Sequence, residues 1–344
     1  MVATSDTQRS PPTPAMGSGQ QKTPTLLSVS QLKVYFPVHN RLFGRVRDFV
    51  RAVDDVTFRI SPGETLGLVG ESGCGKTTLA RAVVRLVNVT SGSIEFEGRN
   101  ITRLRGSELR VQRRAFQIIF QDPFSSLDPR LPAGEIIGEA LDIHRLTPNP
   151  QARREQIAML LKAVGLTAEH AARYPYEFSG GQRQRLAMAR ALAVEPRLLV
   201  CDEAVSAIDV SVQAQIVNLL QELQQRRSLA YLFIAHDLAV VGHLSHRVMV
   251  MYLGRIVELA EAKLLVRAPR HPYTQALISA VPTVESGSKR QRIVLAGDVP
   301  SAVHPPAGCP FHPRCPRAEF PKCQAEPPLL REVTPGHWAS CHFA

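Results

Sequence analysis

The chain has 344 residues, more than one ordinary domain needs and enough for a large core with an appendage. Its 41 lysines and arginines against 30 aspartates and glutamates give a formal charge of +11. Such a charge suits nucleic acid, an anionic membrane surface or a nucleotide, but the basic residues are scattered, which favours a basic solvated surface. No apolar run approaches the roughly 20 residues that cross a bilayer, and no secretory signal peptide is indicated.

The predicted elements alternate strands with helices after a leader, residues 1–26, whose Ser, Thr, Pro and Gln content predicts disorder. Strands are predicted at 26–36, 56–60, 65–69, 92–98, 116–120, 198–201 and 229–234. Helices are predicted at 79–84, across an insertion from about 122 to 173, and at 183–194 and 212–223. We expect a polar, basic loop or hairpin extension at 37–50 and a loop-rich tail from about 268. This order predicts an α/β fold with parallel strands and an antiparallel edge.

A glycine-rich segment fills the pattern G-x-x-x-x-G-K-[ST] between a predicted strand and a predicted helix. Its glycines allow backbone N–H groups to converge on phosphate oxygens, and the helix N-terminus adds its positive dipole end. Lys76 is expected to reach the β- and γ-phosphates, and the Thr77 hydroxyl to bind Mg²⁺. A chance glycine-rich turn is the alternative, and the flanking strand and helix argue against it. The predicted nucleotide contacts are Gly70, Glu71, Ser72, Gly73, Cys74, Gly75, Lys76, Thr77 and Thr78.

ATP hydrolysis also needs a metal-supporting carboxylate, a group that orients water and a contact to the γ-phosphate. Asp202 ends an apolar strand, where it is expected to support Mg²⁺, and the adjacent Glu203 is expected to polarise the attacking water. Gln121 follows another strand and is expected to approach Mg²⁺ and that water. His236 follows a third strand and is expected to hydrogen-bond the γ-phosphate. The alternatives are a helix cap for the two carboxylates and a structural role for the histidine.

A second hydroxyl-and-glycine segment opens the long helix that follows the insertion. It comprises Ser179, Gly180, Gly181 and Gln182. Because hydroxyls and glycines at a helix N-terminus bind anions, this is a second predicted phosphate site in the same chain. Two such sites suggest that two chains share one nucleotide.

Together these segments resemble the ATP-binding subunit of an ABC transporter, from about residue 27 to 265. Gly70–Thr77 resembles the Walker A segment, Gln121 the Q-loop, Ser179–Gln182 the signature and Leu198–Glu203 Walker B. Ser206–Asp209 resembles the D-loop, and His236 resembles the switch histidine. The resemblance implies a P-loop domain with a mixed sheet core, an antiparallel edge sheet and a helical subdomain at about 122–185. It also implies head-to-tail pairing, in which each signature faces the partner's ATP, and an adenine-stacking role for Tyr35.

The sequence departs from the family's commonest pattern at Phe178, where Leu is typical, and at Ala204-Val205, where Pro-Thr is frequent. Neither change removes a phosphate-contacting or water-polarising group, so we expect a competent ATPase.

The tail, residues 266–344, carries a second resemblance through Arg270–Leu277 and the cysteines that follow. It resembles the C-terminal extension of dipeptide and oligopeptide importers, as does Asp122–Pro129. The resemblance implies two transmembrane permease subunits, a second related ATP-binding subunit in a heterodimer, and an extracytoplasmic peptide-binding protein, with no nucleic acid. The expected location is the cytoplasmic face of the inner membrane, and residues 122–130 are the expected permease contact.

Three other functions stay open at this point. Related importers carry nickel or glutathione, so the cargo is open. A soluble ABC-type ATPase of DNA maintenance would suit the charge, but such proteins have long coiled coils or paired zinc knuckles, which this sequence lacks. A regulatory ATPase that drives no transport is disfavoured by Glu203 and His236.

Four of the six cysteines lie in the last 36 residues, whereas Cys74 and Cys201 lie inside nucleotide motifs. Clustered thiols in a cytosolic chain are more typical of a metal or iron–sulfur centre than of disulfides. The spacing alone allows zinc or a [4Fe–4S] cluster, and free thiols are a further alternative. The importer resemblance favours the cluster. The predicted ligands are Cys309, Cys315, Cys323 and Cys341.

Overall fold

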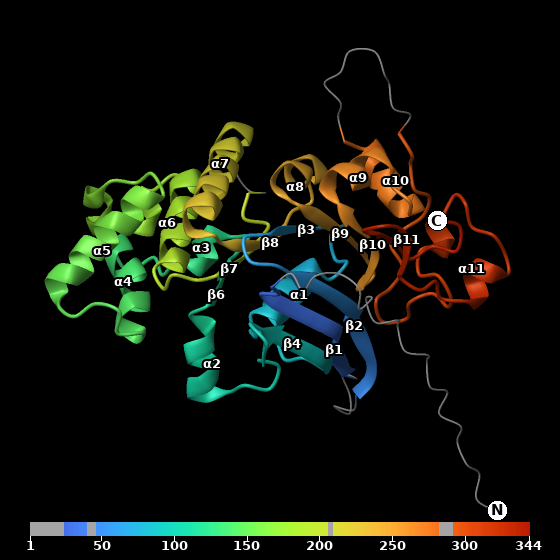
Figure 1. Ribbon diagram of the computed structural model, residues 1–344, viewed down its shortest axis with the longest axis horizontal. Coiled ribbons are helices and arrows are strands. Elements are labelled where there is room, and N and C mark those ends of the chain that lie inside the picture. The colour runs from blue at the N-terminus through green and yellow to red at the C-terminus, as the bar shows by residue number, and fades with distance from the viewer. Residues whose placement is uncertain (1–23, 40–45, 206–208, 282–291) are drawn as a thin grey trace, which may run out of the picture.

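The computed structural model describes residues 24–39, 46–205, 209–281 and 292–344. Two β-sheets form the centre of the molecule, with a group of helices at one end and the C-terminal tail at the other (Figure 1). This arrangement confirms the predicted α/β class with a mixed sheet, an antiparallel sheet and a helical part.

The smaller sheet is antiparallel throughout and has the order β2-β1-β4-β5. Its strands are β1 (Leu27–His39), β2 (Val46–Ile60), β4 (Ser91–Phe96) and β5 (Arg99–Asn100). Of the two structures expected over 37–50, a loop or a hairpin extension, the described residues agree with the extension, because β1 runs to His39 and β2 starts at Val46. Here Pro37 pairs with Phe49 and Val38 with Asp48. Backbone hydrogen bonds hold such a pair together, so exposed and polar side chains are tolerated there.

The larger sheet has eight strands, in the order β11-β12-β10-β9-β3-β8-β7-β6. Strands β9, β3, β8, β7 and β6 run parallel, and β10, β12 and β11 continue the sheet in antiparallel fashion. The bounds are β3 (Thr65–Val69), β6 (Phe116–Ile119), β7 (Leu198–Asp202), β8 (Ala230–Ile234), β9 (Arg247–Tyr252), β10 (Arg255–Glu261), β11 (Arg331–Thr334) and β12 (His337–Ala339). The prediction missed β9 and β10, two apolar runs on either side of the turn at Leu253-Gly254.

Both faces of the parallel strands are buried, and alternate residues enter two different cores. Leu198 and Val200 of β7 pack in the core shared with the antiparallel sheet. Leu199 and Cys201, one residue along, pack in the core shared with the helices. Burial on both sides explains why these strands are continuous apolar runs rather than alternating ones.

The helices include α1 (Lys76–Val83), α2 (Gly106–Arg113), α3 (Pro123–Ser126), α4 (Ala133–Ile143), α5 (Pro150–Ala163), α6 (Gly180–Leu192), α7 (Val210–Arg227) and α8 (Leu238–Leu244). The predicted helical insertion is confirmed, but it is divided. Pro132 precedes α4, Pro150 opens α5, and Gly165 takes a φ of 74° just beyond α5. Proline at a helix start and glycine past its end divide a helical pattern in this way. Of the helices in the described ranges, none is both long and apolar enough to span a bilayer.

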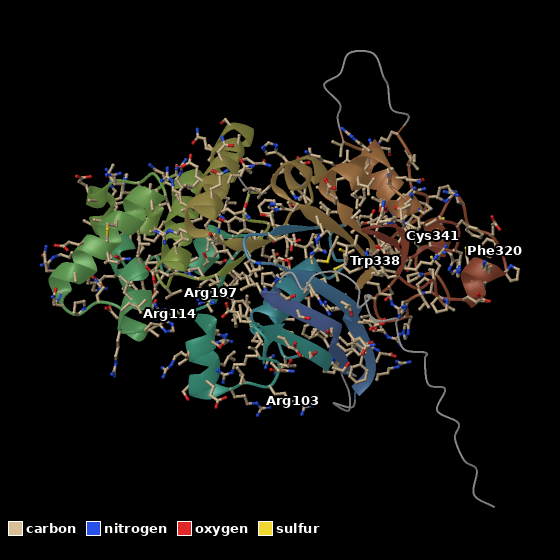
Figure 2. The ribbon with its side chains drawn as sticks, in the orientation of Figure 1. Arg103, Arg114, Arg197, Phe320, Trp338 and Cys341 are labelled. Atoms are coloured by element: carbon tan, nitrogen blue, oxygen red, sulfur yellow. The ribbon has the colours of Figure 1, made fainter. Side chains whose placement is uncertain are left out.

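The tail is built from short elements that lie against the main sheet. They are α9 (Ala262–Arg267), α10 (Pro272–Ser279), the 3₁₀ turn η3 (His312–Arg314), α11 (Lys322–Ala325) and the hairpin β11-β12. Strand β12 pairs with β10, with Ala339 opposite Glu258 and Trp338 opposite Leu259. Figure 2 labels Trp338, which lies in β12, and Cys341, which lies two residues beyond the end of that strand. The tail therefore extends the core sheet.

A buried carboxylate anchors this tail to β10. Glu258 is fully buried, and its side chain accepts the backbone N–H groups of Arg270 and His271 at 2.7 and 2.9 Å. Its Oε1 also lies 2.6 Å from Nε2 of His337, which is equally buried. Burial lowers the pKa of His271 to about 4, although the Glu258 charge opposes that shift. One carboxylate thus joins three tail residues to the sheet.

We predict that Glu258→Ala lowers the free energy of unfolding by about 3–5 kcal/mol, because removing one partner leaves buried polar groups unpaired. Glu261→Ala, at the exposed end of the same strand, is the control and should stay within about 0.5 kcal/mol of wild type. Denaturant unfolding measures both. Equal effects of the two substitutions would contradict this anchoring role.

Candidate nucleotide site

The glycine-rich segment forms a loop between the fully buried strand β3 and helix α1. Gly75 caps α1 with a left-handed φ of 108°. A Cβ added there would lie 2.0 Å from the carbonyl oxygen of Ala52, so only glycine fits. No side chain caps the start of α1 in the described structure, and the N–H groups of its first turn are available to an anion.

Lys76 lies across this loop with its side chain nearly buried, at 4% exposure. Its Nζ donates to the carbonyl oxygens of Gly70 at 2.8 Å and Glu71 at 3.0 Å. The same nitrogen lies 3.9 Å from Oε1 of Glu203. The Lys76 ammonium group therefore lies between the phosphate loop and Glu203, the predicted base.

Thr77 and Asp202 form the predicted Mg²⁺-binding pair. The Thr77 hydroxyl donates to Oδ1 of Asp202 at 3.0 Å. Burial raises the pKa of the Asp202 carboxyl above its ordinary value, although the hydrogen bond from Thr77 lowers it. A hydroxyl and a buried carboxylate fit Mg²⁺, which takes few protein ligands and completes its shell with water and phosphate oxygens.

Glu203 is held in an unusual backbone conformation. It is not a glycine, yet its φ is +50°. Its N–H donates to the carbonyl oxygen of Ile234 at 3.0 Å, and its Oε2 accepts Nε2 of Gln121 at 2.8 Å. Backbone strain of this kind is found where the surrounding structure fixes a functional side chain. The predicted base and the predicted water-orienting amide are therefore in direct contact.

The parallel strands explain why these residues meet. β3, β8, β7 and β6 all point the same way, so their carboxyl ends lie on one edge of the sheet. The phosphate loop follows β3, Glu203 follows β7 and Gln121 lies two residues beyond β6. His236 lies two residues beyond β8 on the same edge, with an exposed side chain.

The second predicted phosphate segment caps α6, in the helical part of the molecule (Figure 1). The Ser179 hydroxyl accepts the N–H of Gln182 at 3.3 Å, and the Ser179 N–H donates to Oε1 of Gln182 at 3.0 Å. Ser179 and Gly180 are exposed. The segment is thus a capping box on the surface, and its role opposite a partner's nucleotide stays a prediction. Of the D-loop segment, residues 206–208 lie outside the described residues.

Tyr35 lies in β1 with its hydroxyl donating to Oδ1 of Asp54 at 2.5 Å. Arg255 binds the other carboxylate oxygen at 2.6 and 2.9 Å. The hydrogen bond from Tyr35 and the Arg255 charge lower the pKa of Asp54, although burial alone would raise it. The hydroxyl is therefore engaged in structure, and stacking of the ring on adenine stays a prediction.

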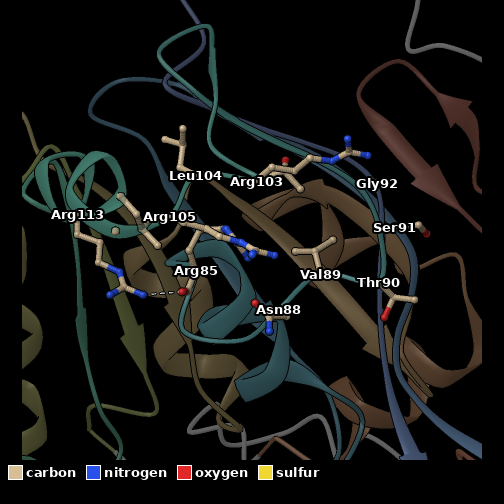
Figure 3. Close-up of a pocket in the computed structure, with 13 residues that line it drawn as sticks. Arg85, Asn88, Val89, Thr90, Ser91, Gly92, Arg103, Leu104, Arg105 and Arg113 are labelled. Atoms are coloured by element: carbon tan, nitrogen blue, oxygen red, sulfur yellow. Dashed lines mark hydrogen bonds between the residues drawn. The ribbon is translucent and has the colours of Figure 1, made fainter.

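A large hollow lies elsewhere, between the segment after α1 and helix α2 (Figure 3). Its volume is about 1140 Å³, and its lining includes Arg85, Arg103, Arg105 and Arg113. The Nη2 of Arg113 donates to the carbonyl oxygen of Arg85 at 2.6 Å. None of the described residues that line this hollow is a carboxylate or a predicted site residue. It lacks the groups that hydrolysis needs, so we do not assign the nucleotide there.

The four tail cysteines influence one another but do not form a recognisable metal site. Burial raises the pKa of Cys309 to about 11, and the thiols of Cys323, Cys315 and Cys341 add to that shift. The Cys309 N–H donates to the carbonyl oxygen of Cys323 at 2.9 Å, and all four thiols are free. Yet the described part of the chain contains no group of three or more His, Cys, Asp or Glu placed to hold a metal ion. The predicted iron–sulfur cluster is therefore not supported by the side-chain arrangement.

Sequence reasoning missed two residues at this site, Tyr273 and Arg314. Both contact Glu71 of the phosphate loop from the tail. They lie 202 and 243 positions away along the chain, and no local pattern indicates such contacts.

Comparison with known proteins agrees with the geometry. The ABC transporter family matches residues 53–206, and the C-terminal region of oligopeptide/dipeptide transporters matches residues 257–323. A probable peptide ABC transporter ATP-binding protein of Sinorhizobium fredii is 53% identical over 92% of this chain and 89% of its own. The oligopeptide transport ATP-binding protein AppF of Bacillus subtilis is 50% identical over 93% of this chain and 97% of its own.

A solved dimer of the ATP-binding cassette MJ0796, bound to ADP and phosphate after hydrolysis, has the same fold. The TM-score is 0.62 at 25% identity, over 69% of this chain and 98% of the cassette. The chain belongs to the ATP-binding subunits of ABC transporters, in the oligopeptide and dipeptide class, and is an ATPase.

Proposed function

We propose that this chain hydrolyses ATP to power the import of dipeptides or oligopeptides through a membrane transporter. The proposed hydrolysis rests on one observation: five side chains lie in contact at one edge of the parallel strands. They are Lys76, Thr77, Asp202, Glu203 and Gln121. The class of cargo rests on the match of the tail to oligopeptide and dipeptide transporters and on the peptide transport named for its relatives.

Each side chain has a distinct role in this proposal. Lys76 neutralises charge on the β- and γ-phosphates, and the loop N–H groups bind the phosphate oxygens. Thr77 and Asp202, with Gln121 at the next strand end, would hold Mg²⁺, which supplies charge neutralisation between the phosphates. Glu203 accepts a proton from the attacking water.

The remaining motif residues complete the reaction around the γ-phosphate. His236, at the same sheet edge, hydrogen-bonds it. Ser179–Gln182 contacts the nucleotide of a second ATP-binding subunit, and its exposed position at the start of α6 supports that role. We propose that this second subunit is a related chain, so that the working pair is a heterodimer.

Coupling to the membrane would pass through residues 122–130. This segment contains α3 and follows Gln121 directly. Arg190 of α6 donates to the carbonyl oxygen of Ser126, so the helix that begins at the signature also holds this segment. Asp128 and Arg130 are paired to each other at its exposed end. We propose that two permease subunits dock here, at the cytoplasmic face of the inner membrane, and receive peptide from an extracytoplasmic binding protein.

We propose a functional division at residue 265, with the ATPase domain at 27–265 and the importer extension at 266–344. The contact of β12 with β10 supports a fixed position for this extension. We also propose that Cys309, Cys315, Cys323 and Cys341 are the ligands of a [4Fe–4S] cluster. The clustering of these four cysteines within the last 36 residues supports that proposal.

Glu203→Gln should lower the ATP hydrolysis rate of the assembled transporter by roughly 10²- to 10⁴-fold, because the amide cannot accept a proton. ATP affinity should be retained, since the amide keeps the size of the side chain. Glu222→Gln, on the exposed face of α7, is the matched control and should leave both unchanged. Hydrolysis by Glu203→Gln at the wild-type rate would exclude Glu203 as the base.

The transport function is tested by affinity purification of the tagged chain from native membranes in mild detergent, with mass spectrometry of what accompanies it. We expect two permeases, a second ATP-binding subunit and a peptide-binding protein. Recovery of the chain alone, or with DNA-repair proteins, would contradict the transport proposal and leave the ATPase chemistry intact.

The cluster proposal predicts about four iron and four acid-labile sulfide per chain after anaerobic purification. Replacing Cys323 with Ser should lower both, whereas Cys201→Ser, in the buried strand β7, should not. Zinc without iron or sulfide, or free thiols without metal, would contradict the proposal.

A further inference from the structure

We propose that the C-terminal extension is part of the nucleotide site, because Arg314 and Tyr273 fix the phosphate loop through Glu71. Arg314 also neutralises a carboxylate that would otherwise repel the triphosphate. Both are positioning residues in this proposal, which rests on the assignment of the phosphate loop made above. Its consequence is that the extension sets the affinity for ATP.

Glu71, the first variable residue of the loop, is held from two sides. Its carboxylate receives both terminal nitrogens of Arg314, with Nη1 to Oε2 at 2.7 Å and Nη2 to Oε1 at 3.1 Å. Its N–H donates to the Tyr273 hydroxyl at 2.8 Å, and its carbonyl oxygen accepts Lys76 Nζ at 3.0 Å. A two-point arginine–carboxylate contact fixes orientation as well as charge.

The contact is shielded from water, which strengthens it. The Arg314 side chain is only 8% exposed and that of Glu71 is 28% exposed. The hydrogen bonds to Glu71 raise the pKa of Arg314 above its ordinary value, although burial opposes this. Tyr273 is fully buried. Surface ion pairs contribute little, whereas removing one partner of a buried pair leaves the other charge uncompensated.

Three packed aromatic rings hold the extension in place beside the loop. Tyr252, at the end of β9, lies 4.8 Å from Tyr273 and 5.2 Å from Phe311 between ring centroids. Tyr273 and Phe311 are 5.5 Å apart, and all three are almost completely buried. Since β9 is hydrogen-bonded to β3, the cluster positions the tail against the strand that carries the phosphate loop.

The turn that carries Arg314 also carries two of the tail cysteines. The His312 N–H donates to the Cys309 carbonyl at 3.0 Å, and the Arg314 N–H donates to the Phe311 carbonyl at 3.0 Å. The Cys315 N–H closes the turn on the His312 carbonyl at 3.3 Å. The folded state of this turn therefore decides whether Arg314 can reach Glu71.

The charges of Glu71 and Arg314 determine the direction in which each substitution should change the affinity for ATP. A carboxylate inside a phosphate loop opposes a polyanion, and Arg314 offsets it at close range. Removing the arginine should therefore weaken ATP binding, and removing the Glu71 charge in addition should restore part of it. A purely structural arginine would give the same loss and recovery in the free energy of unfolding, so denaturant unfolding of the same variants accompanies the affinity measurement.

We would measure ATP affinity, KM and kcat in the assembled transporter. Arg314→Gln should raise the dissociation constant and KM for ATP roughly tenfold, the equivalent of about 1.4 kcal/mol, with kcat within about twofold. Arg314→Lys keeps the charge without the two-point contact, so its dissociation constant and KM for ATP should lie between those of wild type and Arg314→Gln. The double variant Arg314→Gln with Glu71→Gln should recover at least half of the loss on a logarithmic scale.

Arg317→Gln is the matched control, because Arg317 is an exposed arginine of the same tail, and it should behave as wild type. An unchanged affinity in Arg314→Gln would overturn the proposal, and so would a loss that Glu71→Gln fails to reverse. Lys76→Ala separates this result from the proposed function. If wild type and Lys76→Ala bind ATP equally, the phosphate-loop assignment itself fails.

Discussion

The candidate site depends on the shared direction of four parallel strands. Because β3, β8, β7 and β6 are paired in parallel, their carboxyl ends form one edge, and the phosphate loop, Gln121, Asp202, Glu203 and His236 all lie at or just beyond those ends. A shift of one residue in the pairing of β7 would turn Asp202 away from Thr77. The strands are buried on both faces, so such a shift would also exchange the residues of two cores, which fixes their register.

The same edge concentrates negative charge, and the structure balances it residue by residue. Asp202 receives a hydrogen bond from Thr77, and Glu203 receives one from Gln121 and lies near Lys76. The overall charge of +11 contributes little to this balance, because the acidic side chains nearest the phosphate loop are each paired with a neighbouring side chain. The hollow beside α2 is lined by several arginines, yet none of the predicted site residues lines it. Clustered basic residues in this molecule therefore do not mark the candidate nucleotide site.

Local signals made most of the candidate site predictable from the sequence. The phosphate loop could be recognised because a strand, a glycine turn and a helix follow one another within twenty residues. The strand-end residues Gln121 and Asp202 were predictable for the same reason, since each directly follows or ends a buried apolar run. Over 37–50 the sequence left a loop and a hairpin extension open, because polar and basic side chains fit both, and only the pairing of Pro37 with Phe49 and Val38 with Asp48 distinguishes them.

What could not be predicted depends on contacts between distant segments. Glu258 with His337, and Glu71 with Arg314, are 79 and 243 residues apart and have no local pattern. The thiols illustrate the same limit, since spacing suggested a shared metal site and the folded side chains gave proximity without a ligand set. Composition described the tail as loop-rich, but its position against β10 is a property of the fold.

The contact with Glu71 changes how the extension is best understood. If it were only an appendage, its contacts would lie on the outer strand β10, where Glu258 already anchors it. Instead, two of its side chains reach past β9 to the phosphate loop and bind Glu71, the carboxylate within that loop. The cation that contacts this glutamate comes from the tail. The extension and the phosphate loop are therefore one electrostatic unit.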